Sequence, residues 1–483
     1  MAIFDKLQPS TLWKYFDAIT KIPRPSKNEE KIIAYLIDFA NLNKLEFKKD
    51  DAGNLLVTKP AFHSKKDSPP IILQSHVDMV CEKNSNVVHD FNNDPLHTFI
   101  EGDWVKAKGT TLGADDGVGV AAMMAILSDP DLVHGSLECL FTIDEETGLT
   151  GAFELSAGFL KGKTLINLDS EDEGELFIGC AGGIDTSAIF NYTYQPVFES
   201  YKAYLVSVTG LQGGHSGDEI HRNRGNAIKI MASFLSEAIT YAGAELHRFE
   251  GGNLKNAIPR EAFASVMVQP ALEKEFLSLC EVFQRNTQKD LLQTEPSFTF
   301  IIDPIPTPDT KLKKEFVKRL IEAVSACPHG VISWSREIED LVETSTNLAS
   351  IKFIPEHQIM VATSQRSSLD IAKRNIAHRV ASVFSDAGAE IIHSKGYPGW
   401  TPDLNSQLLK TTKMAYVELF GEEAKVKAIH AGLECGLFLE KYPGLDMISF
   451  GPTIKGAHSP DERLNITSVN KFWELLTKVI QQI

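Results

Sequence analysis

The sequence lacks the features that mark secreted, membrane-spanning and nucleic-acid-binding proteins. Its six cysteines are scattered and include no CxxC pair, which is typical of a reducing compartment. No apolar run approaches the ~20 residues that cross a bilayer, and residues 1–16 contain no signal-peptide core. Lys and Arg total 48 against 64 Asp and Glu, and the formal net charge of −16 repels phosphate backbones. We therefore expect a cytoplasmic protein that binds neither nucleic acid nor membrane.

A length of 483 residues exceeds what one ordinary hydrophobic core accommodates, so two domains are expected. In the first part of the chain, short apolar runs alternate with segments of helical spacing. The expected buried strands are residues 70–74, 137–143 and 164–168, and the expected helices are residues 10–22, 28–42 and 117–127. This βαβ order predicts an α/β domain in which helices sandwich a mostly parallel sheet.

The pattern changes after about residue 183, where half-exposed strands and amphipathic helices alternate. The expected elements are strands 204–209, 262–269 and 390–394, an extended segment 348–364, and helices 223–239, 272–285 and 369–387. Their recurring order predicts an α+β domain of two related halves. The first pattern returns in helix 405–420, strand 446–450 and helix 468–480. We therefore expect residues 1–184 and 399–483 to form one domain, with residues 185–398 inserted.

Five short segments each end an apolar run with residue types that bind zinc well. They contain His76 and Asp78, Asp115 and Asp116, Glu145 and Glu146, Asp169, and His458. Ligands of open α/β sheets gather at the carboxyl ends of the strands, where these segments are expected to lie. Two histidines and several carboxylates predict the centre of a paired-metal hydrolase.

The spacing within these segments suggests how they divide the chemistry. His76 and Asp78 are two apart on a strand and share a face, so Asp78 can accept the imidazole N–H. Asp115 and Asp116 lie between Gly113 and Gly117 just before a helix, and on that motif alone a helix N-cap is a commoner explanation than a bridge between two cations. Of the neighbouring Glu145 and Glu146, one can bind metal while the other takes a proton from water.

A charge count supports a pair of zinc ions. Two Zn²⁺ are neutralised by one bridging hydroxide and by the carboxylates of Asp115, Glu146 and Asp169. Each ion then has four ligands, which are one histidine, one terminal carboxylate, the bridging Asp115 and the hydroxide.

These segments resemble the M20 family of di-zinc peptidases. The HxD, GADDG and acid-cluster segments, the strand-ending aspartate and the late AHSPDE segment all occur in family order, and the resemblance covers essentially the whole chain. Within the family, the length, the long insertion and three strings are similar to the bacterial aminoacyl-histidine dipeptidases. These strings are residues 215–217, 256–259 and 429–436.

The resemblance implies a set of metal ligands. His76, Asp115 and Asp169 match the ligands of one zinc, and Asp115, Glu146 and His458 match those of the other. Two Zn²⁺ are therefore the expected cofactors, and Co²⁺ or Mn²⁺ can substitute for them.

Further residues match supporting roles in the family. Glu145 matches the general base, and Asp78 matches the residue that orients His76. A non-proline cis peptide is implied after Asp115. Some dipeptidases of this type have Asn where this chain has Asp116, a difference expected to alter the charge around the metals rather than their number.

In the inserted domain, which the family uses as a lid, the resemblance points to His215, Asn256 and Arg366 as substrate-binding residues. An Arg fork can hold the C-terminal carboxylate of a dipeptide, and an imidazole can stabilise the oxyanion. Without the resemblance, a turn for His215, a polar loop residue for Asn256 and a surface base for Arg366 are the commoner explanations.

We thus expect a di-zinc dipeptidase that hydrolyses Xaa-His dipeptides. A tripeptide aminopeptidase or an N-acyl amino acid deacylase on the same metal site is the alternative, and a non-catalytic metal-binding scaffold is a remote one. The preferred dipeptide and the physiological metal stay open. A homodimer is expected because family members with shorter insertions complete their sites by dimerising, although the doubled insertion here can supply that contact within one chain.

Overall fold

The computed structural model describes residues 4–198, 200–217 and 219–483. The chain divides into two compact units. The first comprises Met1–Cys180, Trp400–Ala428 and Leu433–Ile483, and the second comprises Ala181–Gly399 and Ile429–Gly432. The expected boundaries lay after residues 184 and 398, and the expected division did not assign the short segment Ile429–Gly432 to the second unit.

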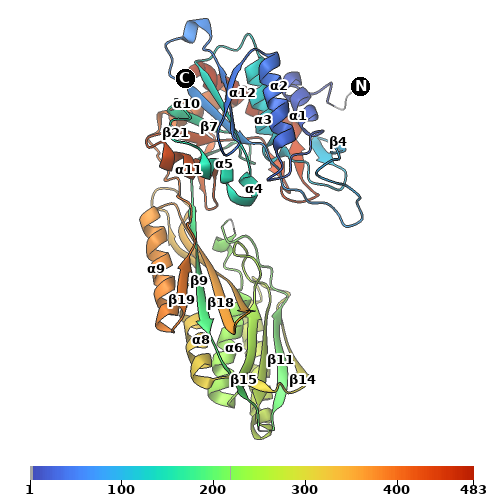
Figure 1. Ribbon diagram of the computed structural model, residues 1–483, viewed down its shortest axis with the longest axis vertical. Helices are drawn as coiled ribbons and strands as arrows, with labels where there is room; N and C mark the ends of the chain where they lie inside the picture. Colours follow the sequence, from blue (N-terminus) through green and yellow to red (C-terminus); the bar gives the residue numbers. More distant parts are fainter. Residues whose placement is uncertain (1–3, 199, 218) are drawn as a thin grey trace. The chain divides into compact units, whose positions relative to one another are not determined.

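The first unit contains an eight-stranded sheet in the order β1-β2-β6-β3-β7-β21-β8-β20 (Figure 1). Its strands are β1 (Glu46–Lys49), β2 (Leu55–Lys59), β3 (Ile71–His76), β6 (Leu137–Thr142), β7 (Thr164–Asn167), β8 (Glu175–Cys180), β20 (Lys425–Ile429) and β21 (Asp446–Ser449). The four central strands, from β6 to β21, run parallel. Antiparallel strands flank them on both sides. The expected parallel sheet is therefore the centre of this unit.

Helices cover this sheet. They are α1 (Ser10–Ile19), α2 (Glu30–Leu42), α3 (Ala114–Ser128), α10 (Gln407–Phe420), α11 (Glu434–Lys441) and α12 (Ile466–Gln482). Helix α3 packs on β3 and is covered by α1, while α10 packs on β21 and on α12. Because α3 lies between the sheet and α1, it is apolar on every side, and its residues from Gly117 to Leu127 are all buried. The α/β class predicted from the sequence is confirmed.

A second, four-stranded sheet in the first unit has the order β22-β23-β5-β4. Its strands are β4 (Thr98–Glu101), β5 (Trp104–Ala107), β22 (Ile454–Lys455) and β23 (Arg463–Asn465). The loop between β22 and β23 carries His458, so this small sheet holds a candidate ligand that is distant in sequence from the others.

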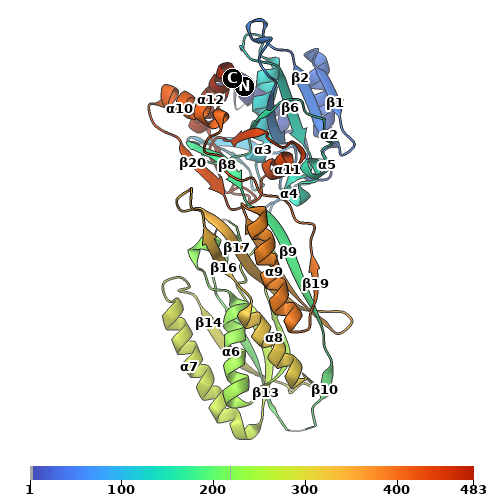
Figure 2. The ribbon, with the colours of Figure 1, turned by 90° about the vertical axis from the view of Figure 1, so that its left-hand side faces the viewer.

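The second unit contains a nine-stranded sheet with helices along one face (Figure 2). The strand order is β14-β11-β13-β12-β17-β18-β9-β19, with β16 also paired to β17. The strands are β9 (Gly182–Asn191), β11 (Lys202–Thr209), β12 (Glu245–Gly251), β13 (Ala262–Val268), β14 (Thr299–Ile305), β16 (Gly330–Trp334), β17 (Val342–Ile354), β18 (Gln358–Ser367) and β19 (Glu390–His393). The helices are α6 (Ala227–Ala242), α7 (Glu273–Leu291), α8 (Lys314–Ala326) and α9 (Asp370–Asp386). One continuous sheet thus joins the two expected halves.

The expectation of a single extended segment at residues 348–364 was wrong. Strands β17 and β18 form an antiparallel hairpin here, with Ile354 paired to Gln358. The chain reverses at Glu356 and His357, whose φ angles are 64° and 56°. Pro355 directly precedes these two residues, and a proline inside an extended run is a turn signal that the sequence analysis did not use.

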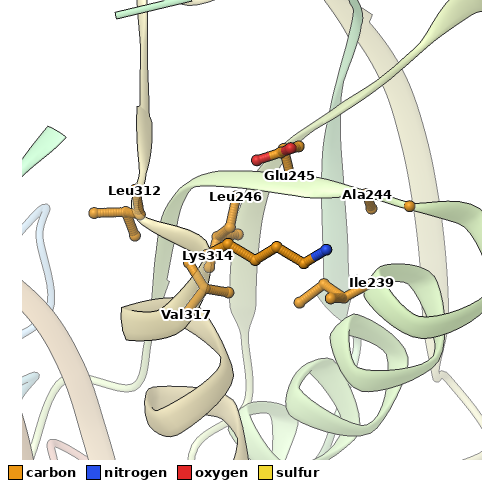
Figure 3. Close-up of a pocket in the computed structure, with 8 residues that line it drawn as sticks. Ile239, Ala244, Glu245, Leu246, Leu312, Lys314 and Val317 are labelled. Carbon is orange, nitrogen blue, oxygen red and sulfur yellow. The ribbon is translucent and has the colours of Figure 1, made fainter. Parts of the chain in front are cut away.

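The core of the second unit is filled by apolar side chains from β9, β11–β13, β17, β18 and all four helices. A small cavity of about 30 Å³ remains beside α6 and α8, with Ile239, Leu246 and Val317 among its walls and Lys314 crossing it (Figure 3). Its volume is that of roughly one water molecule, so it is no substrate site. Among the described residues, every helix is too short or too polar to cross a membrane.

Candidate metal centre

The five predicted metal ligands converge in the first unit. His76 is the last residue of β3, and Asp169 lies two residues beyond the end of β7. Glu146 belongs to α4 (Glu145–Gly148), just after β6, and Asp115 stands at the start of α3. Parallel strands end at one edge of the sheet, so β3, β6 and β7 deliver three of the ligands to the same place.

Asp115 lies between the two histidines and faces both. Its Oδ1 is 3.2 Å from Nε2 of His76, and its Oδ2 is 3.3 Å from Nε2 of His458. Asp169 Oδ1 is 3.4 Å from His76 Nε2, and Glu146 Oε2 is 3.1 Å from His458 Nε2. Two groups of three potential ligands result, each with donor atoms within 4.8 Å of one another, and Asp115 belongs to both. This is the geometry of a carboxylate that bridges two cations.

The charges at this site are arranged to receive cations. Burial, reinforced by the negative charge of Asp115, raises the pKa of Asp169 well above its usual range. Burial acts to raise the pKa of Asp115 too, but hydrogen bonds from His458 and His76 outweigh it and lower that pKa. Hydrogen bonds to Asp115 and Glu146 raise the pKa of His458 to about 11. Closely packed acids of this kind repel one another, and two divalent cations would relieve that repulsion.

Asp78 orients both a histidine and the glutamate pair. Its Oδ1 lies 3.4 Å from Nδ1 of His76, opposite the nitrogen that faces the cluster. Its two carboxylate oxygens accept the backbone N–H groups of Glu145 at 3.1 Å and Glu146 at 3.2 Å. Ser26 Oγ donates a further hydrogen bond at 2.8 Å. A single buried carboxylate therefore fixes one imidazole and the start of α4.

The two explanations of the Asp115–Asp116 motif apply to different residues. Asp115 faces the ligand cluster, whereas Asp116 Oδ1 accepts the backbone N–H of Gly119 at 3.1 Å and so caps α3. The peptide bond between the two aspartates is cis, as the family resemblance implies. Burial raises the pKa of Asp116 to about 8.

Glu462 holds the loop before Asp115, a contact to which the sequence analysis gave no attention. Its carboxylate accepts backbone N–H groups from Leu112 at 2.7 Å, Gly113 at 2.9 Å and Ala114 at 2.7 Å, with Asp115 N at 3.3 Å. The loop that presents Asp115 is thus held by a side chain almost 350 residues away in sequence. The signal was its place in the late AHSPDE segment, four residues after His458.

Arg24 is another residue to which the sequence analysis assigned no role. Its guanidinium is buried and donates to the carbonyl oxygens of Val77 at 2.9 Å and Asp78 at 2.6 Å, and also to that of Gly113. Gly113 has a φ of 64°, and a Cβ there would lie 2.5 Å from Arg24 Nη2, so only glycine fits. An arginine between two prolines in the sequence offered no sign of this role.

The three predicted substrate-binding residues all lie in the second unit. Arg366, on β18, is 8% exposed and donates from Nη1 to the phenol oxygen of Tyr397 at 3.0 Å. Among the described residues, no carboxylate lies within 4.0 Å of its guanidinium. The loops of His215 and Asn256 are joined, since Ser216 N donates to the Asn256 carbonyl at 2.8 Å. The Asn256 side chain is exposed.

One family accounts for most of the chain. Residues 72–482 match the model of peptidase family M20/M25/M40. The sequence is 39% identical to the cytosol non-specific dipeptidase of Escherichia coli (strain K12) over 483 residues, which covers 100% of this chain and 99% of that protein.

Solved structures agree with this result. The crystal structure of aminoacylhistidine dipeptidase from Vibrio alginolyticus superposes with a TM-score of 0.90 at 40% identity, and covers 99% of this chain and 98% of that one. The aminopeptidase PepT of Bacillus cereus ATCC 10987 has a TM-score of 0.58 at 16% identity over 99% of both chains, which indicates a common fold alone.

Proposed function

The chain belongs to peptidase family M20/M25/M40, and from this premise we propose that it is a cytoplasmic di-zinc dipeptidase that hydrolyses Xaa-His dipeptides. The observation that carries the proposal is the position of Asp115, whose two oxygens face His76 and His458. The names of the two full-length relatives, a non-specific dipeptidase and an aminoacylhistidine dipeptidase, support the substrate class.

The donor set suits zinc. His76, Asp115 and Asp169 would hold one ion, and Asp115, Glu146 and His458 the other. Imidazole nitrogens together with carboxylates are ordinary zinc ligands, and Co²⁺ or Mn²⁺ can occupy similar sites. When bound, such a metal pair lowers the pKa of water and polarises a carbonyl group. Metal analysis of the purified protein tests this assignment, with two zinc ions per chain as the expected result.

The protein residues divide the remaining work. Glu145 takes a proton from the attacking water and passes it to the leaving amine of the C-terminal residue. Burial, together with the charges of neighbouring acids such as Glu146, raises the pKa of Glu145 well above its usual range, so this carboxyl group binds a proton more readily than an exposed glutamate does. Asp78 keeps His76 and Glu145 in place through the contacts described above.

The second unit supplies substrate recognition in this proposal. Arg366 binds the free C-terminal carboxylate of the dipeptide, His215 stabilises the oxyanion, and Asn256 adds a polar contact. The absence of an acidic partner for Arg366 among the described residues supports this role, because a buried guanidinium is stable only with a counter-ion or full hydrogen bonding.

A substrate panel tests the function. The zinc-loaded protein is offered dipeptides with C-terminal histidine, dipeptides without it, tripeptides and N-acetyl amino acids. Chelator-sensitive release of histidine from the dipeptides alone is the expected result. Equal cleavage of dipeptides without histidine would favour the broader activity in the name of the Escherichia coli relative. Cleavage of tripeptides or acetylated substrates instead would contradict dipeptidase activity.

Substitutions of the adjacent glutamates separate their two roles. Glu145→Ala is expected to lower kcat by at least about 1,000-fold while both metals stay bound, since this side chain moves a proton. Glu146→Ala is expected to lose one metal. Metal content and kcat are measured on both variants. Loss of metal from Glu145→Ala would reverse the assignment of base and ligand.

A further inference from the structure

A row of buried polar side chains crosses the centre of the main sheet in the first unit. Thr142, Gln74, Asn167 and Ser449 belong to the four neighbouring strands β6, β3, β7 and β21, and each is 0% exposed. Gln74 pairs in register with Asn167, and Asn167 with Ser449. Strands of a parallel sheet that is covered on both faces are normally apolar throughout, so this row requires an explanation.

The hydrogen bonds along the row run in one direction. Ser449 Oγ donates to Asn167 Oδ1, and Asn167 Nδ2 donates to Gln74 Oε1 at 2.6 Å. Gln74 Nε2 then donates to Oε2 of Glu434 at 2.6 Å, and Thr142 Oγ1 donates to the same oxygen at 2.8 Å. The amide groups of Gln74 and Asn167 each donate and accept, so a terminal acceptor is what fixes their orientation. Glu434 is that acceptor.

The row lies next to the candidate metal ligands. Gln74 precedes His76 by two residues on β3, and Asn167 precedes Asp169 by two residues at the end of β7. Side chains two apart on a strand share a face of the sheet. Thr142 is the last residue of β6, directly before the segment that carries Glu145. Gln74 and Thr142 donate hydrogen bonds to Glu434, and Asn167 donates one to Gln74. Each of these three residues therefore lies on the strand end that leads to a site residue.

Glu434 is the first residue of α11 and is itself 0% exposed. Its second oxygen, Oε1, is buried without a hydrogen-bond partner among the described residues. Burial raises the pKa of this carboxyl group to about 7. A buried acid that is only half satisfied costs stability, and such costs are kept where they serve a site.

We propose that Glu434 is a positioning residue of the hydrolytic reaction, which orders the row by accepting from Gln74 and Thr142 and thereby fixes the strand ends that carry His76 and Glu145. The inference rests on the proposed peptidase function. Glu434 acts through these neighbours and does not touch the substrate. Its contribution is the precision with which the ligands are held, since supporting partners of this kind affect metal sites strongly.

Two substitutions separate acceptance of hydrogen bonds from mere filling of space. Glu434→Gln keeps an oxygen that accepts from both donors, whereas Glu434→Leu removes the acceptor at similar volume. We expect Glu434→Leu to lower kcat at least about tenfold with little change in KM and with both metals bound, and Glu434→Gln to stay within about threefold of wild type. The absorption spectrum of the Co²⁺-loaded protein should change in Glu434→Leu and be restored in Glu434→Gln.

Glu138 provides a matched control. It is a buried carboxylate at the opposite end of β6, where it accepts backbone N–H groups of Lys161 at 2.9 Å and Gly162 at 2.8 Å. Glu138→Leu is expected to lower stability without changing kcat or the Co²⁺ spectrum. If Glu434→Leu does not fold, Thr142→Val removes one donor of the same contact and is expected to give a smaller loss of the same kind.

The following outcomes would overturn the inference. They are a wild-type kcat in Glu434→Leu, an equal deficiency in Glu434→Gln and Glu434→Leu, or a Co²⁺ spectrum that none of these variants changes. Failure of the proposed function is a separate result. A wild-type protein that binds two metals but cleaves no dipeptide would refute the dipeptidase assignment, while the Co²⁺ spectra of the variants would still test the positioning role of Glu434.

Discussion

Arg366 is a buried side chain whose hydrogen-bonding capacity is only partly used. Its guanidinium is buried, its Nε has no hydrogen-bond partner among the described residues, and Tyr397 holds Nη1 at 3.0 Å. A carboxylate received in that place forms charge-assisted hydrogen bonds with a group that is already oriented. The free carboxylate of a peptide substrate satisfies this requirement, and an amide does so poorly.

Replacing Arg366 should therefore change substrate affinity more than turnover. Arg366→Gln is expected to raise KM for Xaa-His dipeptides by about 10- to 100-fold, which corresponds to about 1.5–3 kcal/mol for hydrogen bonds to a charged group. The corresponding dipeptide amide, tested as substrate and as competitive inhibitor, should be much less affected. Arg319→Gln, at an exposed position of the same unit, is the control. An equal effect on acid and amide would contradict carboxylate binding.

His329 links the stability of the second unit to pH. Its Nδ1 accepts the backbone N–H of Leu348 at 3.3 Å, and burial lowers its pKa from 6.5 to about 4. As pH falls, the unfolded chain gains this proton before the folded one does. The folded state therefore keeps its full stability above about pH 6.5 and loses up to about 3 kcal/mol of unfolding free energy on acidification to about pH 4.

Denaturant unfolding of wild type and His329→Gln across this pH range measures the effect. Other acids titrate in both proteins, so the informative quantity is the difference between the two free energies. That difference should shrink as the pH falls from about 6.5 to about 4. A difference that does not depend on pH would show that His329 keeps its ordinary pKa in the folded protein.

At the scale of elements, the start of α3 depends on a carboxylate from the far end of the chain. Glu462 is buried and binds the backbone of the loop before Asp115 through the four contacts described above. Glu462→Ala would leave these N–H groups without an acceptor and free the loop to move. We expect metal affinity to fall by about 10- to 100-fold, as is common for supporting partners of metal ligands.

Calorimetric titration of the metal-free protein with Zn²⁺ measures this loss. Glu462→Gln retains one acceptor oxygen and should lie between Glu462→Ala and wild type. Unchanged affinity in Glu462→Ala would mean that the cis segment at Asp115 is held without help from Glu462.

Strands that are buried on both faces could be predicted from the sequence, whereas strands at the edges of the sheet could not. The apolar runs at residues 70–74, 137–143 and 164–168 became β3, β6 and β7 because both faces of these strands are buried. Strands β1 and β20 lie at the edges of the sheet and consist of exposed or half-buried residues, so their sequences resemble loops. The β17–β18 hairpin was predicted as one extended segment because its turn contains no glycine, although Pro355 in that turn is a signal of the break.

At the scale of the whole molecule, the five candidate metal ligands all belong to one of the two compact units. Metal binding should therefore stabilise the first unit selectively, because ions that bind only the folded state add their binding free energy to its stability. We expect a chelator to lower the melting temperature of the first unit and to leave that of the second nearly unchanged.

Differential scanning calorimetry measures the two melting transitions. Tryptophan fluorescence assigns them, because each unit contains tryptophan. Trp13 is buried in the first unit, and Trp334 lies in the second. Readdition of Zn²⁺ should restore the first transition. A chelator-induced shift of equal size in both units would contradict the separation and would mean that the chain unfolds as one cooperative body.

The sequence alone determined which residue types were available and where they stood relative to strand ends. That was enough to predict the α/β class, the two-unit organisation and the five residues His76, Asp115, Glu146, Asp169 and His458 as a group. Alternation and apolar runs are local properties of the sequence. An acidic residue at the end of an apolar run can therefore be recognised without knowledge of tertiary contacts.

Tertiary structure decided what depends on contacts between distant segments. The hydrogen bonds of Glu462 to the loop before Asp115 and of Glu434 to Gln74 span about 350 residues of sequence, and no local pattern encodes them. The same holds for Arg24, whose carbonyl partners are known only once the loop around Gly113 is folded. A side chain that supports a metal ligand needs only an oxygen or an N–H group at the right point in space. Many residues in a sequence could meet this requirement, and only the fold identifies the residue that does meet it.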